Sequence, residues 1–306
     1  MSYVRKSNEI DVEIIECAPS NEGNETVFPI IEGAKWQLAW EAKRNKILQP
    51  LMAESVASFL FCIFGGAANL FVATTSLTLS QDPGSSIPGR FNVALSFAFG
   101  TMFALFFAVP ISGGHIAPNF TLVLATFRKF SWKLVPFYIL AQIVGAFLST
   151  GIIYLCYYST IHHFTGGTDG PVKFAALYVT QPNNYVNTGY IIWVEFISTA
   201  VLTLIVFNLT DANNKYIVSS PMIIPPLIGL MIFLIIMGVG YQGVSISPAR
   251  DLGARLFLQI IYGSEIWSLN HKYFWIATVI PCVGSIVGAG FYDIFFYDHG
   301  KPKKLQ

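Results

Sequence analysis

Two matching stretches, SGGHIAPN at residues 112–119 and GVSISPARD at residues 243–251, lie between apolar runs long enough to cross a membrane. In both, small and polar residues lead into a proline, Pro118 or Pro248. Proline is well tolerated at the first helical position, because its φ suits the helix and its missing N–H would have no partner there. Each stretch therefore predicts an irregular segment that enters a short helix. Two such half-helices in one membrane chain predict a pore built from re-entrant loops.

Composition supports a membrane protein before any motif is considered. Hydrophobic residues make up 54% of the chain and charged residues 11%, whereas soluble domains carry about a quarter charged residues. The net charge of +1 gives no sign of nucleic-acid binding. The four cysteines lie far apart, and no nucleophile–base pair or metal-ligand cluster is recognisable. We therefore expect no disulfide framework, no metal or other cofactor, and no enzymatic activity.

Six apolar segments reach the length of about 20 residues that a helix needs to cross a bilayer. They cover residues 51–79, 91–111, 133–158, 188–209, 218–240 and 273–297. Two more, at 118–128 and 248–258, hold about ten residues each and would reach only about 15 Å. Two such segments meeting end to end would span one hydrocarbon thickness. The predicted fold class is an all-α membrane protein with six transmembrane helices and two re-entrant half-helices.

The distribution of Lys and Arg predicts the orientation. Of the 18 such residues, all but five (Arg90, Lys173, Arg250, Arg255 and Lys272) fall on the side of the two termini. Because cytoplasmic loops carry an excess of positive residues, we expect both termini to be cytoplasmic. We expect a multi-pass protein of the plasma membrane.

The chain also repeats itself. Glu54 opens the first span and Glu195 lies early in the fourth, and each precedes two spans that hold a re-entrant motif between them. Three spans per half require the halves (51–159 and 188–297) to be inverted, which puts a functional site at mid-membrane. We expect residues 1–50 to form a cytoplasmic tail with an interfacial segment, and residues 298–306 to form a short second tail.

These motifs resemble the major intrinsic protein family, the aquaporins and glycerol facilitators, over roughly residues 45–297. The resemblance rests on Ser-Gly-Gly-His-Ile at 112–116, on Pro-Ala-Arg-Asp-Leu-Gly at 248–253, and on the order Glu, motif, Glu, motif. Other features resemble the glycerol-facilitator branch: Thr180–Asn183, Asn208–Asp211, Gly290–Asp293, Asp251, Arg255 and Pro281. The resemblance implies a homotetramer in the lipid bilayer with one pore per subunit.

The central triplets depart from the family pattern, which is Asn-Pro-Ala at both half-helix starts. Here they read Ala117-Pro118-Asn119 and Ser247-Pro248-Ala249. Ser247 can still cap its helix, whereas an alanine cap such as Ala117 costs about 1 kcal/mol relative to Asn. Asn119 is rotated by about 200° from the position of the missing Asn, so it would point away unless the loop shifts register. Three outcomes stay open: a pore with altered selectivity, a donor rescued by Asn119, or a closed pore.

The resemblance also implies an outer constriction formed by Phe97, Ile235 or Ile236, Val244 and Arg250. Spacing from two different motifs disagrees by one residue, so the choice between the isoleucines stays open. An aliphatic residue there, with Arg250 donating to hydroxyl groups, suits glycerol or another small neutral solute. A bulky Phe97 could instead restrict the opening to water.

Several further residues are predicted to support this architecture. We expect the carboxylates of Glu54 and Glu195 to accept hydrogen bonds from the re-entrant backbone, His115 to brace the first loop, and Asp251 to play a structural role. The sequence thus favours a passive channel for small uncharged solutes, with glycerol and water first. A water-only channel, another small-solute channel and a non-conducting structural protein remain the alternatives.

Overall fold

The computed structural model describes residues 47–79, 89–165, 167–168, 170, 172–180, 182, 186–240 and 243–297. The predicted N-terminal tail up to residue 46 and the C-terminal tail from 298 lie outside these residues. The residues from Pro50 onward belong to one compact unit, which is described by itself.

The described residues fold into α-helices and short 3-10 turns, and none of them lies in a strand. The long helices are α2 (Leu48–Leu79), α3 (Gly89–Ser112), α5 (Val135–Phe164), α6 (Thr188–Leu209) and α11 (Phe274–Phe295). Shorter helices are α4 (Pro118–Phe127), α7 (Lys215–Val218), α8 (Ile224–Met237), α9 (Pro248–Tyr262) and α10 (Leu269–Lys272). Three 3-10 turns are η1 (Val172–Leu177), η2 (Pro221–Ile223) and η3 (Gly263–Trp267).

The predicted spans match the long helices, with corrections at their ends. Within the described residues, five helices are long and apolar enough to cross a membrane. The fifth predicted span, 218–240, is wrong in its limits, because α8 holds only 14 residues between prolines at its first positions and Gly238 at its C-cap. The third span continues to Phe164 rather than to residue 158.

The two half-helices differ in length. α4 has 10 residues, as predicted, whereas α9 has 15 rather than about ten. α9 ends at Gly263, whose φ of 67° favours glycine. At 1.5 Å per residue, α9 is about 22 Å long, still too short to cross a bilayer alone.

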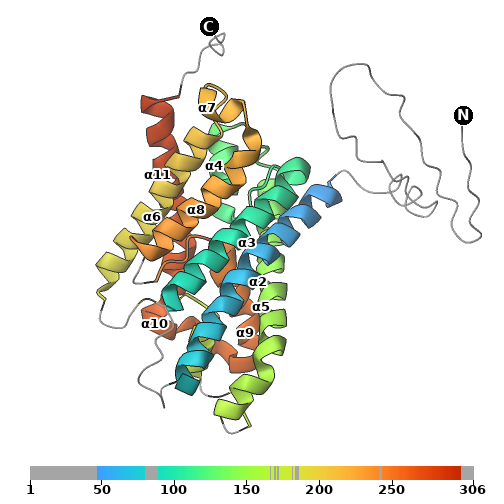
Figure 1. Cartoon of the computed structure of the whole chain (residues 1–306), viewed down its shortest axis with the longest axis vertical. Helices are drawn as coiled ribbons and strands as arrows, with labels where there is room; N and C mark the ends of the chain where they lie inside the picture. The colour runs from blue at the N-terminus through green and yellow to red at the C-terminus, as the bar shows by residue number, and fades with distance from the viewer. Residues whose placement is uncertain are drawn as a thin grey trace, which may run out of the picture. The chain divides into compact units, whose positions relative to one another are not determined.

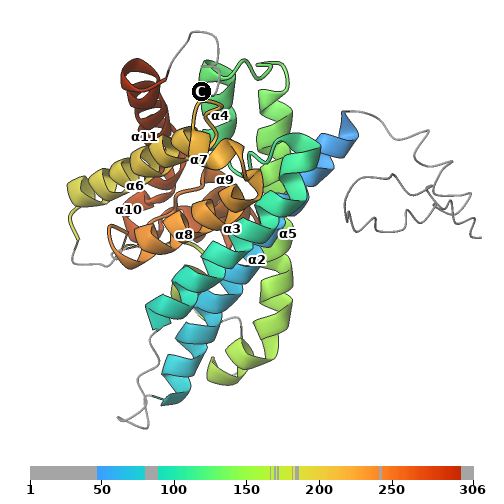
Figure 2. The same cartoon turned by 45° about the horizontal axis from the view of Figure 1, so that its top comes forward.

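The helices pack in pairs that mirror the internal repeat: α6 lies on α11, α3 on α8, and each half-helix lies against a long helix, α4 on α11 and α9 on α5. Figures 1 and 2 show α2, α3 and α5 running side by side, with α6, α8 and α11 beside them.

Two glycines permit close backbone contact between helices at matching places in the two halves. A Cβ on Gly145 of α5 would lie 2.0 Å from the carbonyl oxygen of Ser55 on α2. A Cβ on Gly288 of α11 would lie 2.1 Å from the carbonyl oxygen of Ala200 on α6. Small residues let membrane helices approach this closely.

Large apolar side chains cover the outer surface of the bundle. Exposed examples are Phe103 on α3, Leu155 on α5, Trp193 on α6 and Ile294 on α11. Contiguous exposed apolar surface on this scale is unusual for a soluble monomer. It is the surface expected of helices that face lipid.

Candidate functional site

The first re-entrant segment is held by one buried carboxylate. Glu54 of α2 is fully buried and accepts hydrogen bonds from the backbone N–H groups of His115 (2.9 Å) and Ile116 (2.8 Å). It also accepts from the Ser112 hydroxyl (2.6 Å) and the Gln142 amide (2.8 Å). A carboxyl group has two oxygens, and each of them can accept two hydrogen bonds. Glu54 therefore fixes the irregular backbone that precedes α4.

Glu195 of α6 holds the second re-entrant segment in the same way. It is fully buried and accepts from the backbone N–H groups of Ser245 (2.5 Å) and Ile246 (3.3 Å), and from the Tyr273 hydroxyl. Ile246 and its counterpart Ile116 both adopt a left-handed backbone, with φ of 65° and 62°. A β-branched residue rarely has a positive φ. The same strained turn therefore precedes both half-helices.

The starts of the two half-helices differ in their caps. Ser247 precedes α9, and its side chain accepts from the backbone N–H of Arg250 at 3.4 Å. Ala117 precedes α4 and supplies no side-chain cap. Asn119 donates its amide to the Ser285 hydroxyl of α11 at 2.8 Å, and its own Oδ1 is buried without a partner in the described part of the chain. Asn119 thus faces α11 and does not replace the missing cap.

His115 lies in the first re-entrant segment, just before α4, and its ring lies between aromatic neighbours. Its Nδ1 is 3.2 Å from the Thr121 hydroxyl, and its ring lies 4.6 Å from that of Phe130 and 4.9 Å from that of Tyr138. These contacts join the re-entrant segment to α4 and α5.

The second half-helix carries an ion pair within itself. Arg255 Nε lies 2.6 Å from Asp251 Oδ2, and both side chains are fully buried. The Arg255 guanidinium also donates to the Ile266 carbonyl at 2.7 Å. Asp251 therefore supports the fold from one turn inside α9.

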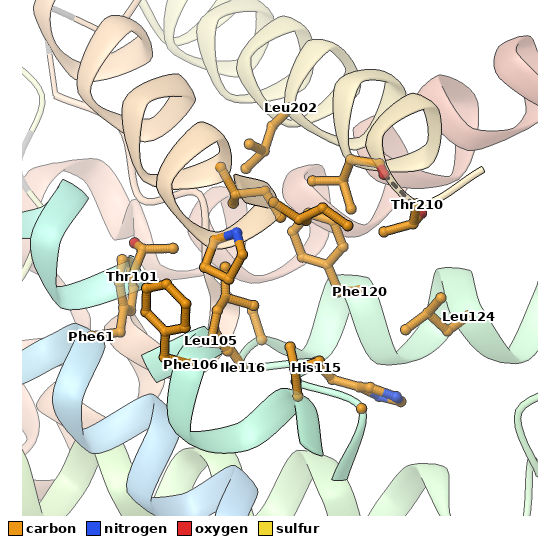
Figure 3. A pocket seen from close by; sticks show the side chains of 18 of the residues that line it. Phe61, Thr101, Leu105, Phe106, His115, Ile116, Phe120, Leu124, Leu202 and Thr210 are labelled. Atoms are coloured by element: carbon orange, nitrogen blue, oxygen red, sulfur yellow. Dashed lines mark hydrogen bonds between the residues drawn. The ribbon is translucent and has the colours of Figure 1, made fainter. Parts of the chain in front are cut away.

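A cavity of about 530 Å³ opens beside the two half-helix starts, and we call it the Arg128 cavity. Ala117, Ser247, Ile116 and Ile246 line it at one end, and Arg128 lies at the other. Figure 3 shows how side chains of different helices point into it: Phe61, Thr101, Leu105, Phe106, Phe120, Leu124, Leu202 and Thr210. Its wall is mostly apolar, with few polar groups.

A second cavity of about 350 Å³, the Arg250 cavity, lies on the other side of the half-helix starts. Phe97, Ile236, Val244 and Arg250 all line it. Ile235, the neighbouring residue, does not line it, and its side chain packs in the hydrophobic core. The structure thus favours Ile236 over Ile235 at this wall.

Arg250 is held from three sides. Its guanidinium donates to the Thr180 hydroxyl and to the Val244 carbonyl (3.5 Å), and it lies 4.7 Å from the centre of the Phe97 ring. The sequence does not predict the contact of Thr180 with Arg250, because Thr180 stands out there only in a stretch that resembles the glycerol-facilitator branch. The two residues are 70 positions apart, so no local sequence pattern indicates the contact.

The same faces of α3 and α8 line both cavities in succession. On α3, Val93 and Phe97 line the Arg250 cavity, and Thr101 and Leu105 follow at helical spacing along the Arg128 cavity. On α8, Ile236 lines the first cavity and Ile232 the second. The two cavities therefore lie end to end along one path, with the Phe97 ring near their junction.

Arg128 lies at the far end of the Arg128 cavity and is held there by contacts that we call the clamp on α11. Arg128 follows α4 and pairs with Asp293 through two hydrogen bonds of 3.0 and 2.7 Å. Its guanidinium also lies between the rings of Phe207 and Tyr297, at 4.2 and 4.3 Å from their centres.

Residues 41–292 match the sequence profile of a family described as Major intrinsic protein. The chain belongs to the major intrinsic protein family. Among relatives of this family, it is 34% identical to Aquaglyceroporin-2 of Rhizophagus irregularis over 84% of this chain and 80% of that protein. It is 35% identical to Aquaglycerol porin AQY3 of Saccharomyces cerevisiae over 84% of this chain, but that alignment spans only 39% of the yeast protein.

A solved structure of the family agrees with the arrangement of the helices. The aquaglyceroporin from Plasmodium falciparum matches with a TM-score of 0.69 and 26% identity, over 81% of this chain and 96% of that one. The predictions of the family and of the all-α fold with two re-entrant half-helices are therefore confirmed. The chain is an integral membrane protein of a channel family.

Proposed function

We propose that this protein is a passive channel for small uncharged solutes, with glycerol as the main permeant and water as the second. The Arg250 cavity carries this proposal. Its lining combines the apolar side chains of Phe97, Ile236 and Val244 with polar groups, among them the Arg250 guanidinium, which can donate hydrogen bonds. Glycerol has a carbon edge and a hydroxyl edge, so it suits such an opening. The names of two relatives, Aquaglyceroporin-2 and Aquaglycerol porin AQY3, agree with this substrate class.

Electrostatics oppose the passage of cations. The starts of α4 and α9 both meet the Arg128 cavity, where Ala117 and Ser247 line its wall. A helix N-terminus carries about half a positive charge. Arg250 adds a full charge beside the other cavity. A neutral solute passes these charges more easily than a proton or a metal ion does.

Stopped-flow light scattering on proteoliposomes tests the proposal. The wild type should pass glycerol well above the rate of protein-free liposomes, and Val244→Trp should abolish the flux by filling the Arg250 cavity. Leu230→Trp is the matched control, because Leu230 is half exposed on α8 and lines neither cavity. Equal loss in both tryptophan variants, or a wild type without glycerol flux, would contradict the proposal.

The altered triplets favour a second candidate, a non-conducting structural protein. The Asn119 side-chain amide donates to Ser285, and Ala117 and Ser247 have no side-chain amide that could donate to a permeant. One lost hydrogen bond costs a solute about 1 kcal/mol, roughly a fivefold slower passage. The variant Ala117→Asn/Ser247→Asn separates the candidates: a silent wild type beside an active variant would mean that the triplets close the pore.

We propose further that the channel lies in the plasma membrane as a homotetramer with both termini cytoplasmic. The bias of Lys and Arg toward the side of the termini supports the orientation. Protease protection of tagged termini in intact cells tests it, and cross-linking in native membranes tests the tetramer.

A further inference from the structure

Gly65 of α2 faces the ring of Phe97, which lies near the junction of the two cavities. A Cβ built on Gly65 would lie 2.1 Å from Cδ1 and from Cε1 of Phe97, and 2.4 Å from its Cγ. Nonbonded carbon atoms settle at about 3.5–4.0 Å. The three atoms nearest to that Cβ all belong to one ring, so the absence of a side chain at Gly65 is what leaves room for Phe97.

The backbone around this contact is fixed. One turn beyond Phe97, a Cβ on Gly100 would lie 3.2 Å from the Leu60 carbonyl oxygen and 3.3 Å from that of Phe61, so α2 and α3 are already in close backbone contact. Thr101 also donates its hydroxyl to the Phe97 carbonyl at 2.8 Å. A side chain at Gly65 would therefore displace the ring rather than the helices.

Two neighbours restrict the movement of the Phe97 ring, and a cavity lies beside it. Phe61 lies against it with ring centres 5.2 Å apart, and the Arg250 guanidinium lies over it at 4.7 Å. The remaining side faces the Arg250 cavity, which Phe97 lines. We expect a ring displaced from Gly65 to move into the Arg250 cavity, which Val244 and Arg250 also line.

We propose that Gly65 is a specificity-determining residue of this channel, acting by positioning Phe97. With no side chain at Gly65, the ring lies back against α2 and the opening beside Arg250 is wide enough for a three-carbon polyol. With a methyl group there, the opening narrows to the size of water. This inference rests on the proposed function, because it assumes that solutes pass the Arg250 cavity.

The neighbouring glycine provides a matched control. Gly66 lies on the same turn of α2, but a Cβ there would meet the terminal methyl group of Ile153 at 2.8 Å. A terminal methyl can move by a change of rotamer. Gly65→Ala and Gly66→Ala make the same chemical change in the same helix, and only the first touches Phe97.

The experiment compares glycerol and water permeability of proteoliposomes holding the wild type, Gly65→Ala and Gly66→Ala. We expect Gly65→Ala to lower the ratio of glycerol to water permeability about tenfold, the effect of about 1.4 kcal/mol on a barrier. Gly66→Ala should keep the wild-type ratio. A ratio unchanged in Gly65→Ala, or lowered equally in both variants, would overturn the inference.

A second substitution at Phe97 tests whether Gly65→Ala acts by displacing the ring or by a general packing defect. Gly65→Ala/Phe97→Leu replaces the ring by a smaller side chain, and it should recover the glycerol-to-water ratio of Phe97→Leu alone. If Gly65→Ala does not reach the bilayer, folding and conduction by the double variant would still support the inference. Failure of the double variant to fold would overturn it, because the Cβ would then meet something other than the ring.

The permeability of the wild type to each solute tests the proposed function separately from this inference. A wild type that passes water but no glycerol contradicts the proposed substrate, and the same variants are then compared by water permeability. A loss confined to Gly65→Ala and relieved by Phe97→Leu would support the positioning role. A wild type silent to both solutes contradicts both proposals.

Discussion

The two half-helices enter the protein through the same backbone turn but are held in place differently. α9 carries its own support: a Ser247 cap and a fully buried Asp251–Arg255 ion pair. α4 has no side-chain cap, and its contacts lead outward to α11, through Asn119 at its start and Arg128 at its end.

This difference shows where each half of the pore takes its stability from. The buried carboxylates and the left-handed isoleucines recur in both halves, so the path of the re-entrant backbone does not depend on the cap. Both half-helices pack on long helices, but the polar side chains at the ends of α4 are paired with α11, whereas the cap and the ion pair of α9 come from its own segment. Substitutions in one half should therefore differ in cost from equivalent substitutions in the other.

The largest effect is expected from Asp251→Asn, which leaves the buried Arg255 without a countercharge. Breaking a buried ion pair costs about 3–5 kcal/mol. We expect a severe fall in the midpoint of thermal unfolding, measured on detergent-solubilised protein by size-exclusion chromatography after heating. Glu265→Gln is the control, because Glu265 is exposed on the turn that follows α9. A midpoint unchanged in Asp251→Asn would mean that α9 does not rely on its internal pair.

The buried carboxylates give the next effect, and the two should not be equal. Each oxygen of Glu54 accepts two hydrogen bonds, one of them from a backbone N–H, so an amide nitrogen in Glu54→Gln must face a buried donor. In Glu195→Gln the nitrogen also has to face a backbone donor, but in place of Oε2 it removes a single, long bond, the 3.3 Å one from Ile246.

An unsatisfied buried donor costs about 1–3 kcal/mol. We therefore expect Glu54→Gln to lower the unfolding midpoint more than Glu195→Gln does, in the same heating assay. The reverse order would show that the second re-entrant segment depends more on its carboxylate than the first.

Local features of the sequence were enough to predict most of this fold. Apolar length located the long helices, and the prolines at 118 and 248 gave the starts of both half-helices. The ends of α5, α8 and α9 were missed, because a helix end depends on capping and packing that hydropathy does not report.

The site was less predictable, for a physical reason. Which of Ile235 and Ile236 faces the cavity depends on the rotation of α8, and one residue turns a helix by about 100°. The contact of Thr180 with Arg250 and that of Gly65 with Phe97 join segments far apart in the chain. Only the packed structure brings such segments together.

The N-cap residues of the two half-helices can be exchanged by single substitutions. Ser247→Ala makes the start of α9 resemble that of α4, and Ala117→Ser does the reverse. Losing or gaining an N-cap changes stability by about 1 kcal/mol. We expect the unfolding midpoint to fall slightly in the first variant and to rise slightly in the second. A fall in both would mean that the Ala117 position has no room for a hydroxyl group.

The smallest effect is expected at the clamp that ends α4. Asp293→Asn makes the same chemical change as Asp251→Asn, but the Arg128 and Asp293 side chains keep 24% and 11% of their surfaces exposed. Arg128 also keeps its contacts with Phe207 and Tyr297. Partly exposed ion pairs contribute about 0–1 kcal/mol, so we expect a loss of about 0.5 kcal/mol or less.

Salt separates the two aspartate variants further. At about 1 M NaCl the screening length falls to about 3 Å, so the difference between wild type and Asp293→Asn should vanish. The difference for Asp251→Asn should persist, because solvent ions do not reach a pair with no exposed surface. A salt-insensitive cost at Asp293 as large as that at Asp251 would mean that the clamp on α11 supports α4 as strongly as the internal ion pair supports α9.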